Sequence, residues 1–528
     1  MSYYHDNFRH CRVSPIQTGY HSWSDSTNYQ RAYYITFRNY NPQDPGHLHE
    51  NLNVTINLYG GRTKDDGLKS TIDLSKYSAD YRFIDLSGGA STITSITFKN
   101  YDAKKYNQRD DSSMPFIFFG DDKIQNYKSS LINCSFENIT LNKKQPLVRM
   151  AYIDSPQDSS VISESGGLID GCVFRDNHAS QMVAIAGSKS DGKHSDNGPI
   201  FYGFEARNNL FENNNGTMEY NSNSSSLGLC MKIWNEAFNV TLNNNNFIKN
   251  TNAVHGAAYC IIGFNATVTN NYFEGNEAVF GAGIEAHNGN ITIKNCTFIN
   301  NVAKGNHTQH PYRDGSGAGI ALLGCNNYIS NCTFINNTAH GHAGAIDIVG
   351  GYKIESGIEY YLVANNTTIE HSKFFDNLAK DYAGGVHVNG TNTLIDNCTF
   401  KRNNASFAGA TRLIGENVTI IKSNFTNNNA IQGGACFIEG ENAHIYNSNF
   451  INNNAIRDVP KVRGNASLST AGGALSIVGN NTYVINSTFT DNSANVDTSK
   501  LEGFGGALYM NGRNLTFNNN DFTNNIAT

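Results

Sequence analysis

The chain has 528 residues, of which 16% are charged, and 39 Lys and Arg against 45 Asp and Glu give a net charge of −6. No basic run and no stripe of basic and aromatic residues occurs, which argues against nucleic acid as a partner. No stretch is long and apolar enough to cross a membrane, so we expect no membrane insertion within this chain.

In chain order, residues 1–50 are polar and aromatic and lack the repeat that fills the rest of the chain, so we predict an irregular N-terminal cap or linker. Residues 51–160 contain short β-branched runs and a degraded motif, in which Phe98 and Phe136 precede an Asn by two residues. We interpret them as early, irregular coils. Residues 161–528 form a regular array of repeats.

The repeat is a Phe three residues before an Asn, followed 7 to 21 residues later by a Gly/Ala-rich run, with the tightest spacing at 25 or 26 residues. The motif Phe residues are Phe174, Phe211, Phe247, Phe273, Phe298, Phe334, Phe374, Phe400, Phe425, Phe450, Phe489 and Phe522. Apolar and polar residues alternate before each Phe, which is typical of short strands. The sequence therefore predicts an all-β fold, a single-stranded right-handed parallel β-helix (solenoid) of about 25 residues per coil with loop insertions.

Stacked coils give each motif position a structural meaning. We expect the Phe residues to form an interior stack, the Asn residues three positions on to form an amide ladder at a corner, and the Gly-Gly-Ala runs to make tight turns. Five cysteines stand two residues before a motif Phe, where other coils carry Ser, which predicts a buried column of free thiols and no zinc site. They are Cys134, Cys172, Cys296, Cys332 and Cys398.

Loop insertions at residues 304–315, 456–470 and 495–503 all fall between the Phe motif and the Gly-rich strand, so we expect them to project from one corner. Residues 351–363 leave the solenoid after that strand, at a different corner. Insertions gathered on one side of a repeat protein often mark a binding face, although neutral surface growth remains an alternative. The ligand-binding candidates are Tyr352, Tyr360, Tyr361, His310, Tyr312, Arg313, Phe437 and Tyr509.

Parallel β-helices also include polysaccharide lyases and glycoside hydrolases, so the outward side chains of the Gly-rich strands are candidate catalytic groups. We predict that these are Glu285, Ala321, Asp347, His387, Arg412, Phe437, Ser476 and Tyr509, one per coil. Asp347 and His387 should lie about 5 Å apart, and Glu285 and Asp347 about 9 to 10 Å apart, within the range of inverting glycosidases. An enzyme would use Glu285, Asp347, His387 and Arg412. A solvated polar face or a ligand-contact face are the alternatives.

No metal ligand set or cofactor motif is apparent, and we expect no cofactor. His340 and His342 form a His-x-His pair, which we interpret as part of a turn. Many N-x-S/T sequons occur, but Asn295 and Asn331 fall in turns that we expect to be buried, so the sequons carry little weight.

The pairing of the Phe motif with Gly-Gly-Ala-Leu, as at residues 472–475 and 505–508, resembles the repeats of chlamydial polymorphic outer-membrane proteins. The sequence of residues 331–339, NCTFINNTA, resembles the repeats of the adhesin-like surface proteins of methanogenic archaea. The resemblance covers residues 161–528 well and residues 51–158 weakly. It implies a right-handed parallel β-helix on the cell surface, with adhesion as its role.

The sequence thus favours a non-enzymatic, extracellular adhesin-like glycoprotein that presents a β-helix face and inserted loops to glycans or to surface proteins of host or neighbouring cells. A polysaccharide lyase or glycoside hydrolase is the alternative, and a structural spacer is a second. Residues 1–10 lack the apolar segment of a signal peptide, and the repeat opened at Phe522 is not completed. We therefore expect a fragment whose export signal and anchor lie elsewhere.

Overall fold

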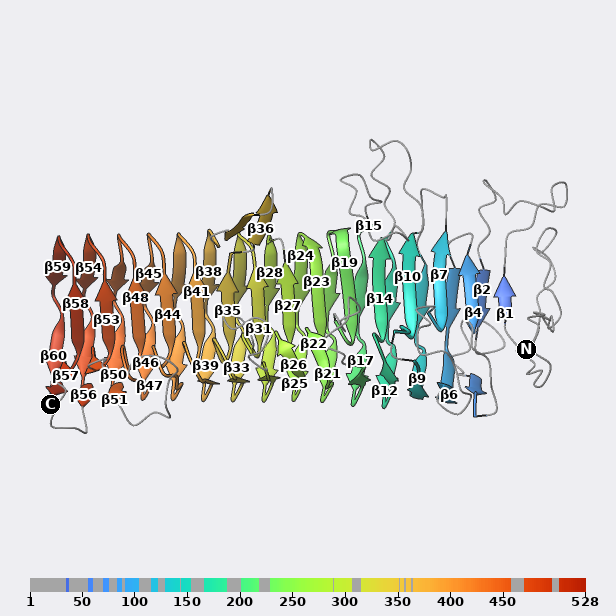
Figure 1. The fold of residues 1–528 in the computed structure, drawn as a ribbon, viewed down its shortest axis with the longest axis horizontal. Coiled ribbons are helices and arrows are strands. Elements are labelled where there is room, and N and C mark those ends of the chain that lie inside the picture. The colour runs from blue at the N-terminus through green and yellow to red at the C-terminus, as the bar shows by residue number, and fades with distance from the viewer. Residues whose placement is uncertain are drawn as a thin grey trace. The chain divides into compact units, whose positions relative to one another are not determined.

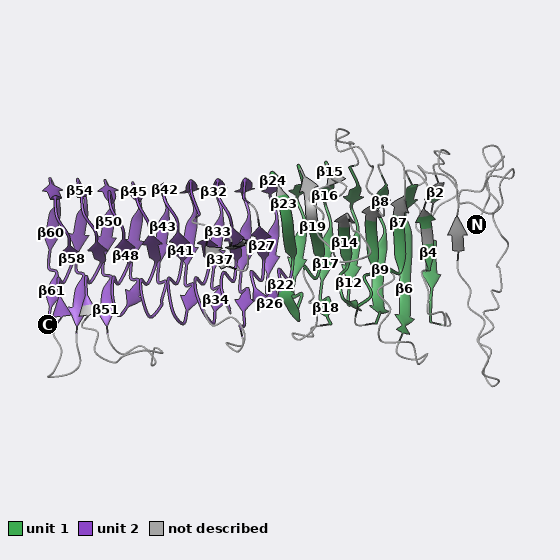
Figure 2. Cartoon of the chain, turned by 45° about the horizontal axis from the view of Figure 1, so that its top comes forward, with its two compact units in different colours: residues 1–254, 258–266 green, residues 255–257, 267–528 purple. Residues whose placement is uncertain are grey.

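The computed structural model describes residues 35–37, 56–59, 70–75, 83–87, 91–103, 115–121, 129–142, 144–152, 166–187, 201–217, 228–287, 289–305, 315–350, 352–355, 358–361, 364–456, 470–495 and 503–528. They fall into two compact units, unit 1 with residues 1–254 and 258–266 and unit 2 with residues 255–257 and 267–528 (Figure 2). The described residues contain no α-helix, and so no helix among them is long and apolar enough to cross a bilayer.

Each coil of unit 2 contributes one strand to each of three parallel sheets, which confirms the predicted β-helix (Figure 1). In one representative coil, Ile291, Ile293 and Phe298 are buried, as the alternation predicts. The corners lie at Asn290 and Asn295, whose φ angles of 54° and 53° are in the left-handed region that Asn tolerates. Asn at the corners therefore sets where one strand ends and the next begins.

The first sheet of unit 2 holds the Gly-rich strands, which are β27 (Ile284–His287), β31 (Ile320–Leu323), β35 (Ile346–Val349), β41 (Val386–Asn389), β44 (Thr411–Ile414), β48 (Cys436–Glu439), β53 (Leu475–Val478) and β58 (Leu508–Asn511). The second sheet holds β28 (Ile291–Lys294), β32 (Asn327–Ser330), β38 (Thr367–Glu370), β42 (Thr393–Asp396), β45 (Thr419–Ile421), β49 (His444–Tyr446), β54 (Thr482–Ile485) and β59 (Leu515–Asn518). The third sheet holds β25 (Tyr272–Glu274), β29 (Thr297–Ile299), β33 (Thr333–Ile335), β39 (Lys373–Phe375), β43 (Thr399–Lys401), β46 (Asn424–Thr426), β50 (Asn449–Ile451), β55 (Thr488–Thr490) and β60 (Asp521–Thr523).

Unit 1 has the same three-sheet arrangement. Its first sheet holds β1 (Ile35–Phe37), β4 (Ile84–Ser87), β7 (Ile117–Asp121), β10 (Val148–Tyr152), β14 (Val183–Gly187), β19 (Met231–Phe238) and β23 (Tyr259–Phe264). The second holds β2 (Ile56–Tyr59), β5 (Ser91–Thr94), β8 (Ser130–Ile132), β11 (Leu168–Asp170), β16 (Glu205–Arg207) and β20 (Thr241–Asn243). The third holds β3 (Ser70–Asp73), β6 (Ile96–Asp102), β9 (Ser135–Thr140), β12 (Val173–Arg175), β17 (Leu210–Glu212) and β21 (Asn246–Ile248).

The motif Phe residues form the predicted interior stack within each unit. In unit 2 the rings from Phe273 to Phe522 stack face to face, with neighbouring centroids between 4.5 and 4.9 Å apart. From Phe273 to Phe489 these Phe residues and the Asn three residues after each of them are buried, whereas Phe522 in the last coil is 50% exposed. Asn403, for example, donates from Nδ2 to the carbonyl of Phe374 at 2.9 Å and to Oδ1 of Asn428 at 3.0 Å. Each ladder Asn thus has hydrogen-bond partners for its side-chain amide, although that amide is buried at the corner.

The early coils of unit 1 keep the same register as the later ones. Phe98, Phe136 and Phe174 stack, and the early Asn100 takes the left-handed corner position with φ of 62°. In these coils Tyr101 and Ile139 pair with each other and are buried where later coils carry the ladder Asn. The irregularity is therefore an apolar side chain in the ladder position, with no change in coil geometry.

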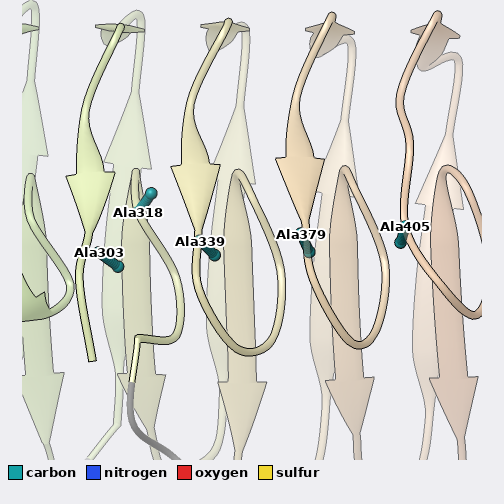
Figure 3. Packing of buried hydrophobic residues seen from close by; sticks show 5 residues of the cluster. All are labelled: Ala303, Ala318, Ala339, Ala379 and Ala405. Atoms are coloured by element: carbon teal, nitrogen blue, oxygen red, sulfur yellow. The ribbon is translucent and has the colours of Figure 1, made fainter. Parts of the chain in front are cut away.

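Small residues let neighbouring turns approach closely. A Cβ added to Gly434 would lie 2.0 Å from the carbonyl oxygen of Gly473, which only glycine permits. Ala303, Ala339 and Ala379 occupy matching positions on successive coils and are buried in the same corner (Figure 3). This packing positions the segment that leads into each strand of the first sheet.

The cysteine column is buried and its thiols are free, as predicted. The Sγ of Cys332 donates to the carbonyl of Ser330 at 3.2 Å, a role that Ser plays in other coils. The expectation for two sequons was wrong, because Asn295 and Asn331 are exposed. Both are left-handed corner residues, and their side chains point away from the interior that the flanking strands fill.

The insertion after β35 begins with an antiparallel hairpin of β36 (Tyr352–Glu355) and β37 (Ile358–Tyr361), in which Tyr352 pairs with Tyr361. The hairpin leaves after a first-sheet strand, as predicted. Residues 306–314, 457–469 and 496–502, which make up most of the other three insertions, lie outside the described residues.

Candidate functional site

The outward side chains of the first sheet of unit 2 form a single column, here called the outward column, one residue per coil. Strand pairing places them in the predicted order Glu285, Ala321, Asp347, His387, Arg412, Phe437, Ser476 and Tyr509. Asp347 and His387 are therefore neighbours, and Glu285 and Asp347 lie two coils apart, as the sequence predicts.

Three members of the column form a hydrogen-bonded chain. His387 Nδ1 lies 2.7 Å from Asp347 Oδ1, and Arg412 Nη1 lies 3.3 Å from His387 Nε2. Since a guanidinium only donates, Nε2 must accept, which assigns the ring proton to Nδ1 and directs it to the carboxylate. The chain therefore runs from Arg412 through His387 to Asp347.

Arg412 also stacks between aromatic rings. Its guanidinium carbon lies 4.1 Å from the Tyr382 ring centroid and 5.9 Å from that of Phe437. The Arg412 side chain is 18% exposed, and its Nη2 reaches Glu439 Oε2 only at 3.9 Å. Burial lowers the pKa of Arg412, while the nearby Tyr382, Glu439 and Asp347 act in the opposite direction. The group stays a cation at the edge of the solvent.

Glu285 is the centre of a second cluster. Its carboxylate lies 2.7 Å from His255 Nδ1 and 2.8 Å from His287 Nε2, and the His255 ring stacks on Phe280. Burial raises the pKa of Glu285, but the charge of His255 and hydrogen bonds from both histidines outweigh it, so the pKa is well below its ordinary value. Both carboxylate oxygens are engaged by side chains of the chain itself.

The expectation of a solvated or ligand-contact face is wrong for the acid–base candidates, because Glu285, Asp347 and His387 are only 3%, 4% and 3% exposed. The turn before each strand folds over the column. At Gly281, with φ of 50°, an added Cβ would lie 2.9 Å from the Cβ of Glu285. Both carboxylates are almost fully covered, so their proximity does not by itself make an active site.

His342, Asp347 and His387 have ligand atoms within 4.8 Å of one another, a composition that suits a divalent metal. The sequence placed His342 only in a turn. The hydrogen-bond chain argues against a metal here, because Arg412 uses Nε2 of His387 and Asp347 receives the proton on Nδ1. A metal at this site would also meet the positive charge of Arg412.

A second row of side chains, which was not predicted from the sequence, lies beside the outward column. Tyr382 pairs with Phe407 and Phe407 with Gln432, all of them half-buried. The Tyr382 and Phe407 rings are 5.7 Å apart, and His342 packs 4.7 Å from Tyr382. Each of these residues lies two positions before a Gly of the tight turn, and this spacing is the sequence pattern from which the row could have been predicted.

We define the surface strip as Tyr382, Phe407, Arg412 and Phe437. Together these residues present aromatic rings and one cation at partial exposure on consecutive coils. Of the predicted ligand-binding residues, Phe437 belongs to the strip. Tyr509 is half-buried two coils further along and packs against Phe504.

The remaining ligand-binding candidates lie in two of the insertions. Tyr352, Tyr360 and Tyr361 lie on the β36–β37 hairpin, and only its backbone is described. His310, Tyr312 and Arg313 lie outside the described residues.

In unit 1 the corresponding outward position carries Arg149, Ala184 and Lys232 on successive strands of the first sheet. Burial lowers the pKa of Lys232 to about 8, and the charge of Arg149 acts in the same direction. The two units therefore differ in the charge of this column.

Comparison with known proteins agrees with this architecture. Residues 356–527 match the family model described as a right handed beta helix region. The chain is a right-handed parallel β-helix, and the predicted fold class is confirmed. No curated protein sequence matches the chain.

Among solved structures, the chain is similar to a mannuronic acid specific polysaccharide family 6 lyase enzyme from human gut microbiota. The identity is 9% and the TM-score 0.26, with 67% of this chain and 86% of that chain covered. A likeness at this level carries no information about activity.

Proposed function

We propose that this protein is a non-enzymatic, adhesin-like β-helix of the cell surface that binds glycans along the first sheet of unit 2. The observation that carries the proposal is the contrast between the acid–base candidates of the outward column and the surface strip. The carboxylates that could perform acid–base chemistry are covered and hydrogen-bonded, whereas the rings and guanidinium of the surface strip stay half-exposed. Aromatic faces with a few fixed polar groups are typical of sugar-binding surfaces.

The scaffold supports this role. The surface strip rests on strands paired on both sides and on a continuous Phe stack, so its geometry is held rigidly before a ligand arrives. Successive coils repeat at about 4.8 Å, which offers an extended ligand equivalent contacts along the solenoid. The resemblance to chlamydial and archaeal surface repeats points to the same class of function and to display outside the cell, toward glycans or surface proteins of other cells.

The test measures binding and turnover on the same purified chain with one panel of neutral and acidic polysaccharides. We expect binding without release of reducing ends or unsaturated products. Tyr382→Ala and Phe437→Ala should each weaken binding by about fivefold or more, since each removes one aromatic ring worth roughly 1 kcal/mol or more. Tyr483→Ala is the matched control, because Tyr483 is a half-buried ring on the second sheet, stacked 4.9 Å from His444.

A polysaccharide lyase or hydrolase is the competing function, favoured by the Asp347–His387 hydrogen bond. Turnover that disappears in Asp347→Asn, with the fold intact, would establish it and overturn the proposal. A folded chain that neither binds nor cleaves any member of the panel would leave a structural spacer as the role.

A further inference from the structure

Arg412 has more hydrogen-bond donors than the structure uses. A guanidinium carries five N–H groups, and that of Arg412 donates from Nη1 to Nε2 of His387. The nearest carboxylate, Glu439, is 3.9 Å from Nη2, beyond hydrogen-bonding distance, and is itself 53% exposed. The Arg412 side chain is 18% exposed, so a ligand can approach its remaining donors.

The guanidinium is also held in one orientation. The Tyr382 ring supports one side at 4.1 Å, Phe437 lies 5.9 Å away, and His387 anchors Nη1. His387 is in turn oriented by the buried Asp347. A long side chain fixed in this way loses little conformational freedom when it binds a ligand, which favours affinity. Asp347 and His387, the former catalytic candidates, thus act as positioning residues.

The planar fork of a guanidinium matches the two oxygens of a carboxylate. We propose that Arg412 is the carboxylate-binding residue of this surface and that the ligand is an acidic polysaccharide, whose uronate carboxylates pair with Arg412 while its ring faces pack on Phe407 and Phe437. This inference rests on the proposed glycan-binding function. Glu439 is the internal competitor, because its side chain approaches the same donors.

An acidic peptide fits the site less well. Peptides that bind sheets add a strand to a free edge, but β44 is paired with β41 on one side and with β48 on the other. What the surface offers instead is rings and a cation in a row along the coils. That arrangement suits an extended chain of sugars.

The experiment compares polygalacturonate with the same polymer after its carboxyl groups have been reduced to alcohols, using the full chain. We expect the acidic polymer to bind at least about tenfold more tightly than its reduced form. Arg412→Gln should remove this preference, and Arg412→Lys should restore only part of it because an ammonium lacks the fork. Arg402→Gln is the control, since Arg402 forms an exposed bidentate pair with Asp376 at the corner that follows the third sheet.

Glu439→Gln gives a test in the opposite direction that does not threaten folding, because Glu439 is exposed. Removing the competing carboxylate should strengthen binding of the acidic polymer and leave the reduced polymer unaffected. Circular dichroism of each variant checks the fold.

The outcomes separate the two proposals. Equal binding of both polymers, or an acidic preference that survives Arg412→Gln, would overturn the carboxylate inference and leave glycan binding in place. Binding of poly-glutamate as tight as that of polygalacturonate would replace the acidic polysaccharide by an acidic peptide. Binding of no glycan at all would overturn the proposed function itself.

Discussion

Removing one amide from the Asn ladder tests the main source of order in the coils. Asn428 is fully buried, and its side chain takes part in four hydrogen bonds. Its Oδ1 accepts from the backbone N and from Nδ2 of Asn403, both at 3.0 Å, and its Nδ2 donates to Phe400 O and Asn453 Oδ1. Because Asn428 is not a left-handed residue, Ala introduces no backbone strain there.

Asn428→Ala leaves two buried donors of Asn403 without their acceptor. Each buried donor left unsatisfied costs about 1–3 kcal/mol, so we expect a loss of about 2–6 kcal/mol in local stability. Asn449→Ala is the matched control. Its Nδ2 bonds to Asn424 at 2.8 Å, but it is exposed, and water can replace the bond. Its cost should stay within about 0.5 kcal/mol.

Native-state hydrogen exchange of the amides in β43, β46 and β50 measures the local opening free energy coil by coil, which suits a solenoid that need not unfold in one step. Protection in these strands should fall in Asn428→Ala and stay close to wild type in Asn449→Ala. Equal losses in the two variants would refute the reasoning, because the buried ladder would then contribute no more than its exposed counterparts.

Three further predictions concern other parts of the structure. The pKa of Glu285 is lowered in the folded state, so its charge stabilises the fold above the unfolded-state pKa of about 4.3, and this contribution is lost as the pH falls toward the folded-state pKa. The difference in melting temperature between wild type and Glu285→Gln should therefore shrink below about pH 4.3. A difference that widens there would contradict the hydrogen-bonded cluster around Glu285. Gly473→Ala places a Cβ 1.8 Å from the carbonyl oxygen of Gly506, and urea unfolding should show a loss of about 1–3 kcal/mol or more. Burial raises the pKa of Cys398 to about 12, so about one Cys398 thiol in 10⁴ is ionised at pH 8. Iodoacetamide should therefore label the half-exposed Cys325 in the native protein but Cys398 only after unfolding, and mass spectrometry of the labelled peptides measures this.

The repeat made most of the fold predictable. Phe298 and Phe334 are 36 residues apart and yet stack at 4.7 Å, because coils of one motif align like positions regardless of the loop between them. The same alignment correctly placed Asp347 beside His387 and Arg412 next in line. The early coils were harder to interpret, since Tyr101 and Ile139 in the ladder position hid a register that had not changed.

The candidate site was predictable only in part. Strand alternation identifies which residues leave the interior, but it does not say whether another segment covers them. Glu285 is closed off by His255, 30 residues earlier, and His387 by the turn that carries Tyr382. Such contacts depend on how each turn folds back over the strand that follows, and no period in the sequence encodes that.

By itself, the sequence determined the β-helix, its interior Phe stack and Asn ladder, and the order of the outward column, because these follow from identical units stacking at a fixed spacing. Only the tertiary structure decided which members of that column meet solvent. Glu285, Asp347 and His387 are buried and hydrogen-bonded, whereas the Arg412 side chain keeps 18% of its surface exposed. The physical reason is that exposure depends on what the turns of the same and neighbouring coils place over a side chain, whereas side-chain direction is a property of the strand alone.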